Sequence, residues 1–202
     1  EEIRAPGEVV INAYQSTRAT PRISAQIVKR HARLGQGVKK GQVLVTLSSV
    51  EMAAAQGQLL VSDREWSRVK KLGRKVVSER RYLEAQVARQ QAYAKVLAFG
   101  MTKHQVESLI KERDVSKATG EFELMSTQNG TVIKDDFIVG EIIEPGRVLY
   151  EITNENSLWV EARLTPEDAE KIELEKKAKF IVTKELTIKN EELKSQIENP
   201  KI

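Results

Sequence analysis

The sequence contains two copies of one strand-and-turn pattern, 105 positions apart, and this repeat constrains the fold more than any other feature. The copies align without a gap at residues 25–29 with 130–134, Gly35 with Gly140, Val38 with Ile143, and 41–47 with 146–152. In each copy, short runs of β-branched residues alternate with glycines, which is typical of strands joined by tight turns. A copy of about 25 residues is too short to bury its apolar face alone. We therefore expect the copies to pack together as the two halves of a small β-sandwich.

The two copies carry opposite charge. Residues 22–47 hold six positive charges, whereas the equivalent residues 127–152 hold five negative and two positive charges. Facing surfaces of opposite charge attract, so contact between the halves would neutralise much of both. The chain as a whole has a net charge of +4, and only 5% of its residues are aromatic. The basic stretch 18–40 leaves nucleic-acid binding open as an alternative, but few aromatic platforms exist for base stacking and we expect no nucleic-acid partner.

The segment between the copies has the composition and period of helices. Residues 49–72 contain no proline, and their inward positions follow the three-and-four spacing of a heptad seam. The seam consists of Met52, Ala55, Leu59, Ser62, Trp66 and Val69. Gly73 interrupts this pattern, and Ser78 can cap a second helix.

The two predicted helices are similar in length and are joined by about five residues, so we expect them to form an antiparallel hairpin. The expected inner face of the second helix is Leu83, Val87, Gln90, Ala94 and Leu97. Gly100 ends it, and Thr102 can cap a short third helix that runs through Ile110.

Strand patterns also lie outside the repeat. Residues 7–12, 157–164 and 179–182 alternate like strands, and Thr165 followed by Pro166 indicates a helix start. Together they indicate part of a β-barrel. The remaining residues, 183–202, are charge-mixed and nearly aperiodic, and too few to close a barrel, so we expect a truncated or interrupted C-terminus.

A lipoyl-like sandwich split by a helical hairpin and followed by barrel strands resembles the periplasmic adaptor, or membrane fusion protein, of tripartite resistance-nodulation-division efflux pumps. The stretches that carry the resemblance are GQGVKKGQVL at 35–44, SVEMAAAQ at 49–56, LAFGMT at 97–102 and NSLWVEA at 156–162. They are more similar to the heavy-metal branch than to the drug-efflux branch. The resemblance covers roughly residues 5–182 and implies an elongated, multi-domain chain of mixed α and β structure.

The resemblance also implies a division of the chain into segments. In order, these are an N-terminal strand of the β-barrel at 1–20, the first lipoyl-like half at 21–48, the α-helical hairpin at 49–111, the second lipoyl-like half at 112–153, a β-barrel segment at 154–182, and an unassigned truncated barrel or membrane-proximal region at 183–202.

The implied function is that of a non-enzymatic subunit in the periplasm, associated with the inner membrane, whose signal or anchor segment lies outside this chain. Such a subunit links a proton-driven inner-membrane transporter of the resistance-nodulation-division class to an outer-membrane channel, here for export of heavy-metal cations. Its expected partners are that transporter, the channel protein and further copies of itself in a ring, and no cofactor is expected. An adaptor for drug efflux or type I secretion is the alternative.

Hairpin tips of this family dock on the channel through an Arg, a Leu and a Ser, which Arg68, Leu72 and Ser78 match. The arginine can hydrogen-bond channel carbonyls or carboxylates, the leucine can fill an apolar notch, and the serine can bond the partner's backbone. Residues 63–81 hold eight basic and three acidic residues, a surplus of five that favours an acidic partner. The structural alternative is an N-cap at Ser78, a seam position at Leu72 and a solvated Arg68.

Met101 and His104 are candidate metal ligands, because a spacing of three places both on one face of a helix. A closed site needs three or four converging ligands, and the chain has no cysteine. We therefore expect no metal site here.

A lipoyl or biotinyl carrier domain of a multienzyme complex is the main alternative, since it uses the same sandwich to carry an acylated lysine. That lysine lies at the turn between the halves, where this chain has its hairpin, and Lys39 and Lys40 belong to a different loop. With two histidines, no cysteine, and neither a phosphate loop nor a nucleophile elbow, we expect no catalytic residues.

Overall fold

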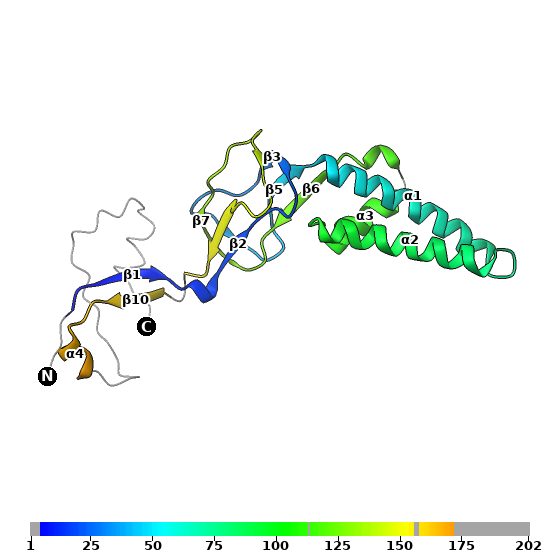
Figure 1. Cartoon of the computed structure of the whole chain (residues 1–202). Helices are drawn as coiled ribbons and strands as arrows, with labels where there is room; N and C mark the ends of the chain where they lie inside the picture. The colour runs from blue at the N-terminus through cyan, green and yellow to red at the C-terminus, as the bar shows by residue number, and fades with distance from the viewer. Residues whose placement is uncertain (1–4, 113, 156–157, 172–202) are drawn as a thin grey trace. The chain divides into compact units, whose positions relative to one another are not determined.

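A computed structural model describes residues 5–112, 114–155 and 158–171. The chain forms two compact units, one of residues 8–161 and one of residues 1–7 with 162–202 (Figure 1). In the described part of the second unit, Thr165 caps the short helix α4 (Pro166–Glu170) by accepting the backbone N–H of Asp168, which confirms the predicted helix start.

Two four-stranded antiparallel sheets build the sandwich of the first unit. Their strands are β2 (Ser16–Ala19), β3 (Ala25–Arg30), β4 (Gly37–Val38), β5 (Val43–Ser48), β6 (Glu121–Met125), β7 (Gly130–Lys134), β8 (Ile142–Ile143) and β9 (Tyr150–Thr153). One sheet has the order β2-β9-β7-β4 and the other β6-β5-β3-β8. Each half therefore contributes strands to both sheets. The 105-residue shift relates β2, β3, β4 and β5 to β6, β7, β8 and β9, and replacing each strand by its equivalent converts one sheet order into the other.

The repeat extends to the turns. Gly35 and Gly140 have φ of 77° and 93°, and Gly41 and Gly146 have φ of 82° and 83°. Glycine adopts this left-handed conformation without the steric cost that a Cβ adds. The repeated glycines thus mark repeated backbone turns, and the predicted two-half sandwich is confirmed.

Strand β2 lies in the sandwich, where residues 16–19 pair with β9, although the sequence places them in the N-terminal barrel segment 1–20. The 105-residue shift aligns them with residues 121–124 of β6. The aligned residues share little chemistry, so the extra repeat unit gives almost no signal in the sequence.

The predicted strands outside the repeat form an open sheet. Strand β1 (Gly7–Ile11) pairs with β10 (Leu158–Ala162), and a one-turn 3-10 helix, η1 (Ala13–Gln15), follows β1. The rings of Tyr14 and Trp159 lie 5.3 Å apart. Within the described residues no sheet closes into a barrel, and the strand expected at 179–182 lies outside them.

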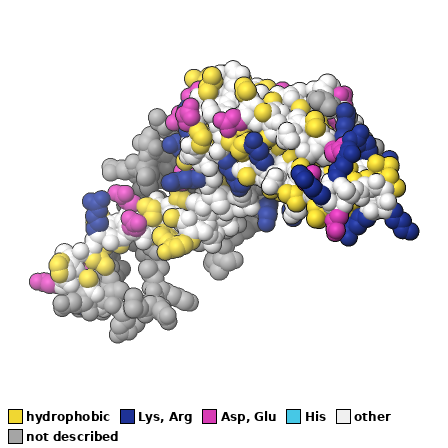
Figure 2. All heavy atoms as spheres, turned by 45° about the vertical axis from the view of Figure 1, so that its right-hand side comes forward, with side chains coloured by type: hydrophobic (Ala, Val, Ile, Leu, Met, Phe, Trp, Pro, Cys, Tyr) yellow, Lys and Arg dark blue, Asp and Glu magenta, His cyan; other side chains and the backbone are white. Residues whose placement is uncertain are grey.

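Three helices form between the halves: α1 (Val50–Leu72), α2 (Glu79–Ala98) and α3 (Lys103–Glu112), followed by a 3-10 turn, η2 (Val115–Lys117). Helices α1 and α2 lie side by side as a hairpin (Figure 1), and Lys and Arg side chains gather over its free end (Figure 2). Thr102 and Gln105 cap α3 reciprocally, each side chain accepting the other residue's backbone N–H. None of the helices in the described segments is long and apolar enough to cross a membrane.

The seam predicted for α1 is confirmed, with Trp66 half-buried and its other members buried. The face predicted for α2 is wrong except at Leu97, which is partly buried and packs against the core. The buried residues of α2 are Ala85, Ala92 and Val96, whereas Leu83 and Val87 are each 48% exposed. Alanines let two helices approach closely, and the contact is supported by Arg89, whose Nε lies 2.6 Å from Oδ1 of Asp63 on α1.

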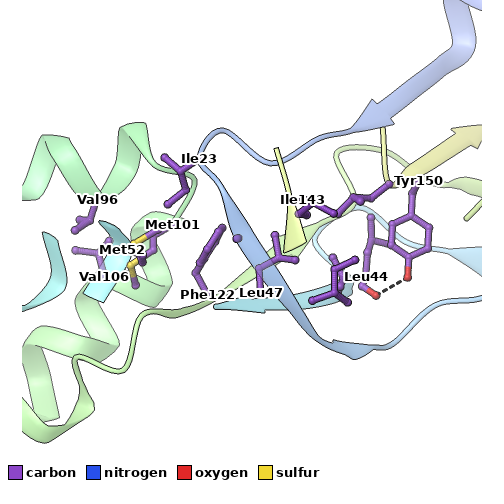
Figure 3. Packing of buried hydrophobic residues seen from close by; sticks show 14 of the residues in the cluster. Ile23, Leu44, Leu47, Met52, Val96, Met101, Val106, Phe122, Ile143 and Tyr150 are labelled. Atoms are coloured by element: carbon purple, nitrogen blue, oxygen red, sulfur yellow. Dashed lines mark hydrogen bonds between the residues drawn. The ribbon is translucent and has the colours of Figure 1, made fainter. Parts of the chain in front are cut away.

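One hydrophobic core runs from the sandwich into the base of the helices (Figure 3). Its labelled members are Ile23, Leu44, Leu47, Met52, Val96, Met101, Val106, Phe122, Ile143 and Tyr150. The Tyr150 hydroxyl lies 2.9 Å from the carbonyl oxygen of Leu44 and 3.0 Å from that of Ala32, and burial raises the pKa of Tyr150 to about 12. This side chain of the second half is thereby tied to the backbone of the first.

Ion pairs also join the oppositely charged halves. Arg30 pairs with Asp135, its equivalent in the repeat, and the Arg30 guanidinium lies 4.1 Å from the centre of the Phe137 ring. Arg18 Nε lies 3.5 Å from Glu151 Oε1. The expected attraction between the halves thus takes the form of specific contacts.

The root of the hairpin, where α1 leaves β5 and the chain re-enters the sandwich at β6, is fixed by a buried glutamine. Gln56 donates from Nε2 to the carbonyl oxygen of Glu121 and accepts the backbone N–H of Gly120, both at 2.9 Å. Gly120 has φ of 82°, and a Cβ there would overlap the carbonyl oxygen of Ser49. The start of α1 is therefore tied to the chain that returns into the sandwich.

Candidate functional site: the tip of the hairpin

The hairpin tip, residues 63–81, is built around a tight turn. Gly73 has φ of 74° and donates its N–H to the carbonyl oxygen of Val69 at 3.1 Å, which ends α1. The N–H groups of Val76 and Val77 both donate to the carbonyl oxygen of Gly73, each at 3.1 Å. The loop between the helices is thus hydrogen-bonded to itself.

A small hydrophobic cluster, separate from the main core, supports this turn. Val69, Val77 and Ala85 are buried in it, and Trp66 and Tyr82 pack against them with ring centres 5.0 Å apart in an edge-to-face arrangement. Because these residues come from both helices and from the loop, they tie the three segments of the tip together.

Arg68 lies on the exposed side of the tip in a three-residue charge network. Its Nη2 lies 2.5 Å from Oε2 of Glu65, whose Oε1 lies 3.0 Å from Nη2 of Arg81 on the other helix. The hydrogen bond from Arg81, aided by the charge of Arg68, lowers the pKa of Glu65 below its usual value. Exposed ion pairs contribute little net stability, so Arg68 can exchange Glu65 for another acceptor at small cost.

The other two predicted residues differ in their surroundings. Leu72 is 49% exposed and lies next to Gly73 at the end of α1, outside the small cluster. Ser78 caps α2, because its Oγ accepts the backbone N–H of Arg81 at 3.4 Å, as the structural alternative predicts. Val76, which the sequence did not single out, is 71% exposed.

Positive charge dominates the tip. Two of its three acidic residues, Asp63 and Glu65, are already engaged by arginines. A shallow hollow of about 280 Å³ on α1 is lined by Asp63, Arg64, Ser67, Arg68 and Lys71. The tip therefore presents apolar and cationic groups together, an arrangement suited to an acidic protein surface.

Sequence reasoning missed Glu65 and Arg81. The spacing of Glu65 and Arg68 is that of an i,i+3 helix pair and could have been noticed. Arg81 gives no such signal, because it reaches Glu65 only when α2 folds back along α1.

The two candidate metal ligands differ in their surroundings. Met101 is buried in the core with its sulfur 3.6 Å from Nε2 of Gln56, whereas His104 is exposed with Nδ1 3.4 Å from Oγ of Ser108. Within the described segments there is no group of three or more His, Cys, Asp or Glu residues placed to hold a metal ion.

The lysines considered for a carrier domain, Lys39 and Lys40, are exposed between β4 and β5. The two halves are joined by the hairpin, so these lysines do not lie at a turn between them.

A sandwich of two interlocked halves with a helical hairpin inserted between them defines a class of protein, the membrane fusion adaptors of efflux systems, which are not enzymes. Within this class, residues 15–154 match the family described as "CzcB-like, barrel-sandwich hybrid domain", and the chain belongs to this family.

Curated relatives agree with this assignment. The chain is 28% identical over 184 residues to the cobalt-zinc-cadmium resistance protein CzcB of Cupriavidus metallidurans. It is 27% identical over 184 residues to the cation efflux system protein CzcB of Alcaligenes sp.. Each alignment covers 87% of this chain and 35% of the relative, so the chain spans about a third of the length of these proteins.

Solved structures show weaker similarity. ZneB from Cupriavidus metallidurans aligns with 84% of this chain and 73% of its own, at 18% identity and a TM-score of 0.48. A MacA-MexA chimera that carries the Pseudomonas aeruginosa MexA α-hairpin domain aligns with 84% of this chain and 59% of its own, at 19% identity and a TM-score of 0.49.

Proposed function

We propose that this chain is the sandwich-and-hairpin part of a periplasmic adaptor that links a proton-driven inner-membrane transporter to an outer-membrane channel for export of heavy-metal cations. Family membership supports the adaptor function, and the names of the curated relatives support cation export. In this proposal strands β1 and β10 belong to the side that faces the transporter, and the sandwich packs beside further copies in a ring.

The observation that carries the proposal is the preorganised, cationic hairpin tip. The loop of the tip has its own hydrophobic cluster and internal hydrogen bonds, and presenting side chains on an ordered loop lowers the entropy cost of binding. Arg68 and Leu72, four residues apart in the last turn of α1, are both exposed just before this loop.

Each residue would act differently at the channel. Arg68 would leave Glu65 and donate to carboxylates or carbonyls of the channel, while Leu72 would fill an apolar notch. Ser78 caps its own helix, so it would fix the start of α2 and offer its hydroxyl proton to the partner's backbone.

The test is charge reversal at the tip. We expect Arg68→Glu to abolish resistance to zinc, cobalt and cadmium in cells whose growth depends on this pump. Lys111→Glu, which makes the same charge change at an exposed position of α3, should leave resistance intact. Melting curves of the purified chain would establish that both variants fold.

Normal metal resistance in the Arg68→Glu strain would overturn the docking proposal. A strain lacking the adaptor that loses resistance to drugs but not to divalent cations would instead favour the drug-efflux alternative.

A further inference from the structure

A groove of about 460 Å³ runs along one side of the sandwich, at the base of the hairpin. Two strands flank it, β2 and β6, each of which is the edge strand of its sheet. Its rim carries the exposed cations Arg18, Arg22 and Lys40, with Glu123 as an opposing carboxylate. Its apolar lining includes Leu97, Phe99, Phe122 and Leu124. An apolar floor with a mainly cationic rim suits an apolar segment that carries acidic residues.

The chain presents such a segment directly after β7. We call residues 135–144 the acidic loop; they comprise the connection that follows β7, the short strand β8 and Glu144. Ile138, Val139 and Ile142 are exposed by 75%, 51% and 69%. Asp136 and Glu144 are exposed beside them. Several neighbouring apolar side chains in solvent mark an interaction surface more often than single ones do.

The acidic loop is held in shape. Phe137 is buried in the core, and the N–H of Gly140 donates to the carbonyl oxygen of Ile27 at 2.8 Å. The N–H of Ile27 donates in turn to the carbonyl oxygen of Glu141 at 2.9 Å. The exposed apolar side chains are therefore displayed by a rigid loop, which lowers the entropy cost of binding.

The repeat supplies an internal control for this loop. The equivalent loop of the first half has the same strands and turn glycines, but Arg33 stands in place of Ile138 and Lys39 in place of Glu144. Val139 is aligned with Leu34, which is also exposed, so an apolar residue at that position is common to both halves. The exposed Ile138 and the acid Glu144 are specific to the second half, and the fold requires neither of them.

The groove and the acidic loop lie at opposite edges of the sandwich. In the sheet β6-β5-β3-β8, strand β6 flanks the groove, and β8, which contains Ile142, is the other edge. One copy therefore cannot fill its own groove with this loop, whereas a neighbouring copy can. A contact between two different surfaces of identical chains repeats from copy to copy and closes into a ring when the rotation allows it.

We propose that the acidic loop of one copy docks into the groove of the next, with Ile138 and Val139 on the apolar floor and Asp136 and Glu144 against Arg22 and Lys40. This inference rests on the side-by-side assembly in the proposed function and deepens it by assigning the two surfaces.

Because the chain has no cysteine, disulfide trapping gives a direct test. Lys40→Cys places a thiol on the groove rim, and Val139→Cys places one on the acidic loop. The two single variants, carrying different affinity tags, are mixed and oxidised with copper phenanthroline. We expect a mixed-tag disulfide dimer, little homodimer of either variant, and a ladder of higher oligomers from the double variant.

Lys75→Cys at the hairpin tip, mixed with Val139→Cys, is the matched control for random collision. A mixed dimer no more abundant than in this control would overturn the proposal. So would a Val139→Cys homodimer as abundant as the mixed dimer, because that result would indicate contact between two acidic loops.

Charge reversal provides a second measurement. We expect Lys40→Glu or Glu144→Lys alone to weaken self-association about tenfold in sedimentation velocity, and a mixture of the two variants to recover it in part. Unchanged association in both single variants would contradict the assigned contact.

These readouts are independent of channel docking. Arg68→Glu should leave the mixed dimer unchanged, so loss of metal resistance and loss of copy-to-copy contact can be told apart.

Discussion

The root of the hairpin and its tip use the same two helices but are stabilised differently. At the root, Met52 and Val96 join a core that is continuous with the sandwich, and Gln56 hydrogen-bonds the returning chain. At the tip, three buried side chains and a set of exposed ion pairs replace that core.

This difference indicates how stability and binding are divided along the hairpin. Buried apolar contacts contribute far more to the free energy of unfolding than exposed ion pairs do. The tip can therefore exchange its polar partners on binding without loosening the fold, whereas the root cannot change without destabilising the whole unit.

The sharpest test of this contrast is the same substitution in both regions. Leu59→Ala should lower the free energy of unfolding by about 3 kcal/mol, because Leu59 of α1 is fully buried in the core that continues into the sandwich, and the cavity cannot collapse completely. Leu72→Ala should change it by less than about 0.5 kcal/mol, because Leu72 is half exposed. Urea denaturation of both variants measures the difference.

In cells, Leu72→Ala should lower metal resistance although it barely changes the free energy of unfolding, since it removes a proposed docking group from a folded protein. Equal destabilisation by the two substitutions would mean that the tip is part of one cooperative core.

The next largest effect is expected at the root, for Gly120→Ala. A methyl group there would overlap the carbonyl oxygen of Ser49, and φ of 82° is unfavourable for alanine. We expect a loss of about 2 kcal/mol in the free energy of unfolding, measured by thermal melting. Gly41→Ala is the matched control, because Gly41 also has φ of 82° and has open space at its Cβ position. It should cost less, and equal losses would show that backbone strain alone is responsible.

A smaller effect is expected between the halves of the sandwich. Tyr150→Phe removes the hydroxyl that lies near two buried carbonyl oxygens, and should cost about 1 kcal/mol in the free energy of unfolding. Phe137, whose ring packs against Tyr150, should keep the packing intact. A neutral result in chemical denaturation would mean that water replaces the hydroxyl.

The smallest effect on stability is expected for Glu65→Gln at the tip. The pKa of Glu65 is lowered in the folded state, so its stabilising effect is fully present above its unfolded pKa of about 4.5 and is lost as the pH falls through the lower folded value. Wild type and variant should therefore differ slightly at pH 7 and converge in acid. Denaturation curves at several pH values check this, and a difference that grows in acid would contradict the assigned pairing.

Much of the hairpin could be predicted because its signals are local. Ser78 as the cap of α2 and Thr102 as the cap of α3 depend on neighbouring residues, and both are confirmed. The seam of α1 is periodic and was predicted correctly. The face of α2 was not, because Leu83 and Val87 suggest burial by hydrophobicity alone, while close helix packing selects Ala85 and Ala92.

The sequence by itself determined the two repeated halves, the inserted helices and the excess of positive charge at the tip, since each depends on periodicity, glycine position or residue type. Only the tertiary structure decided that β2 pairs with β9, that Arg81 reaches Glu65, and that the groove and the acidic loop lie at opposite edges. These features join residues far apart in the chain, and their contacts depend on packing geometry that no local pattern encodes.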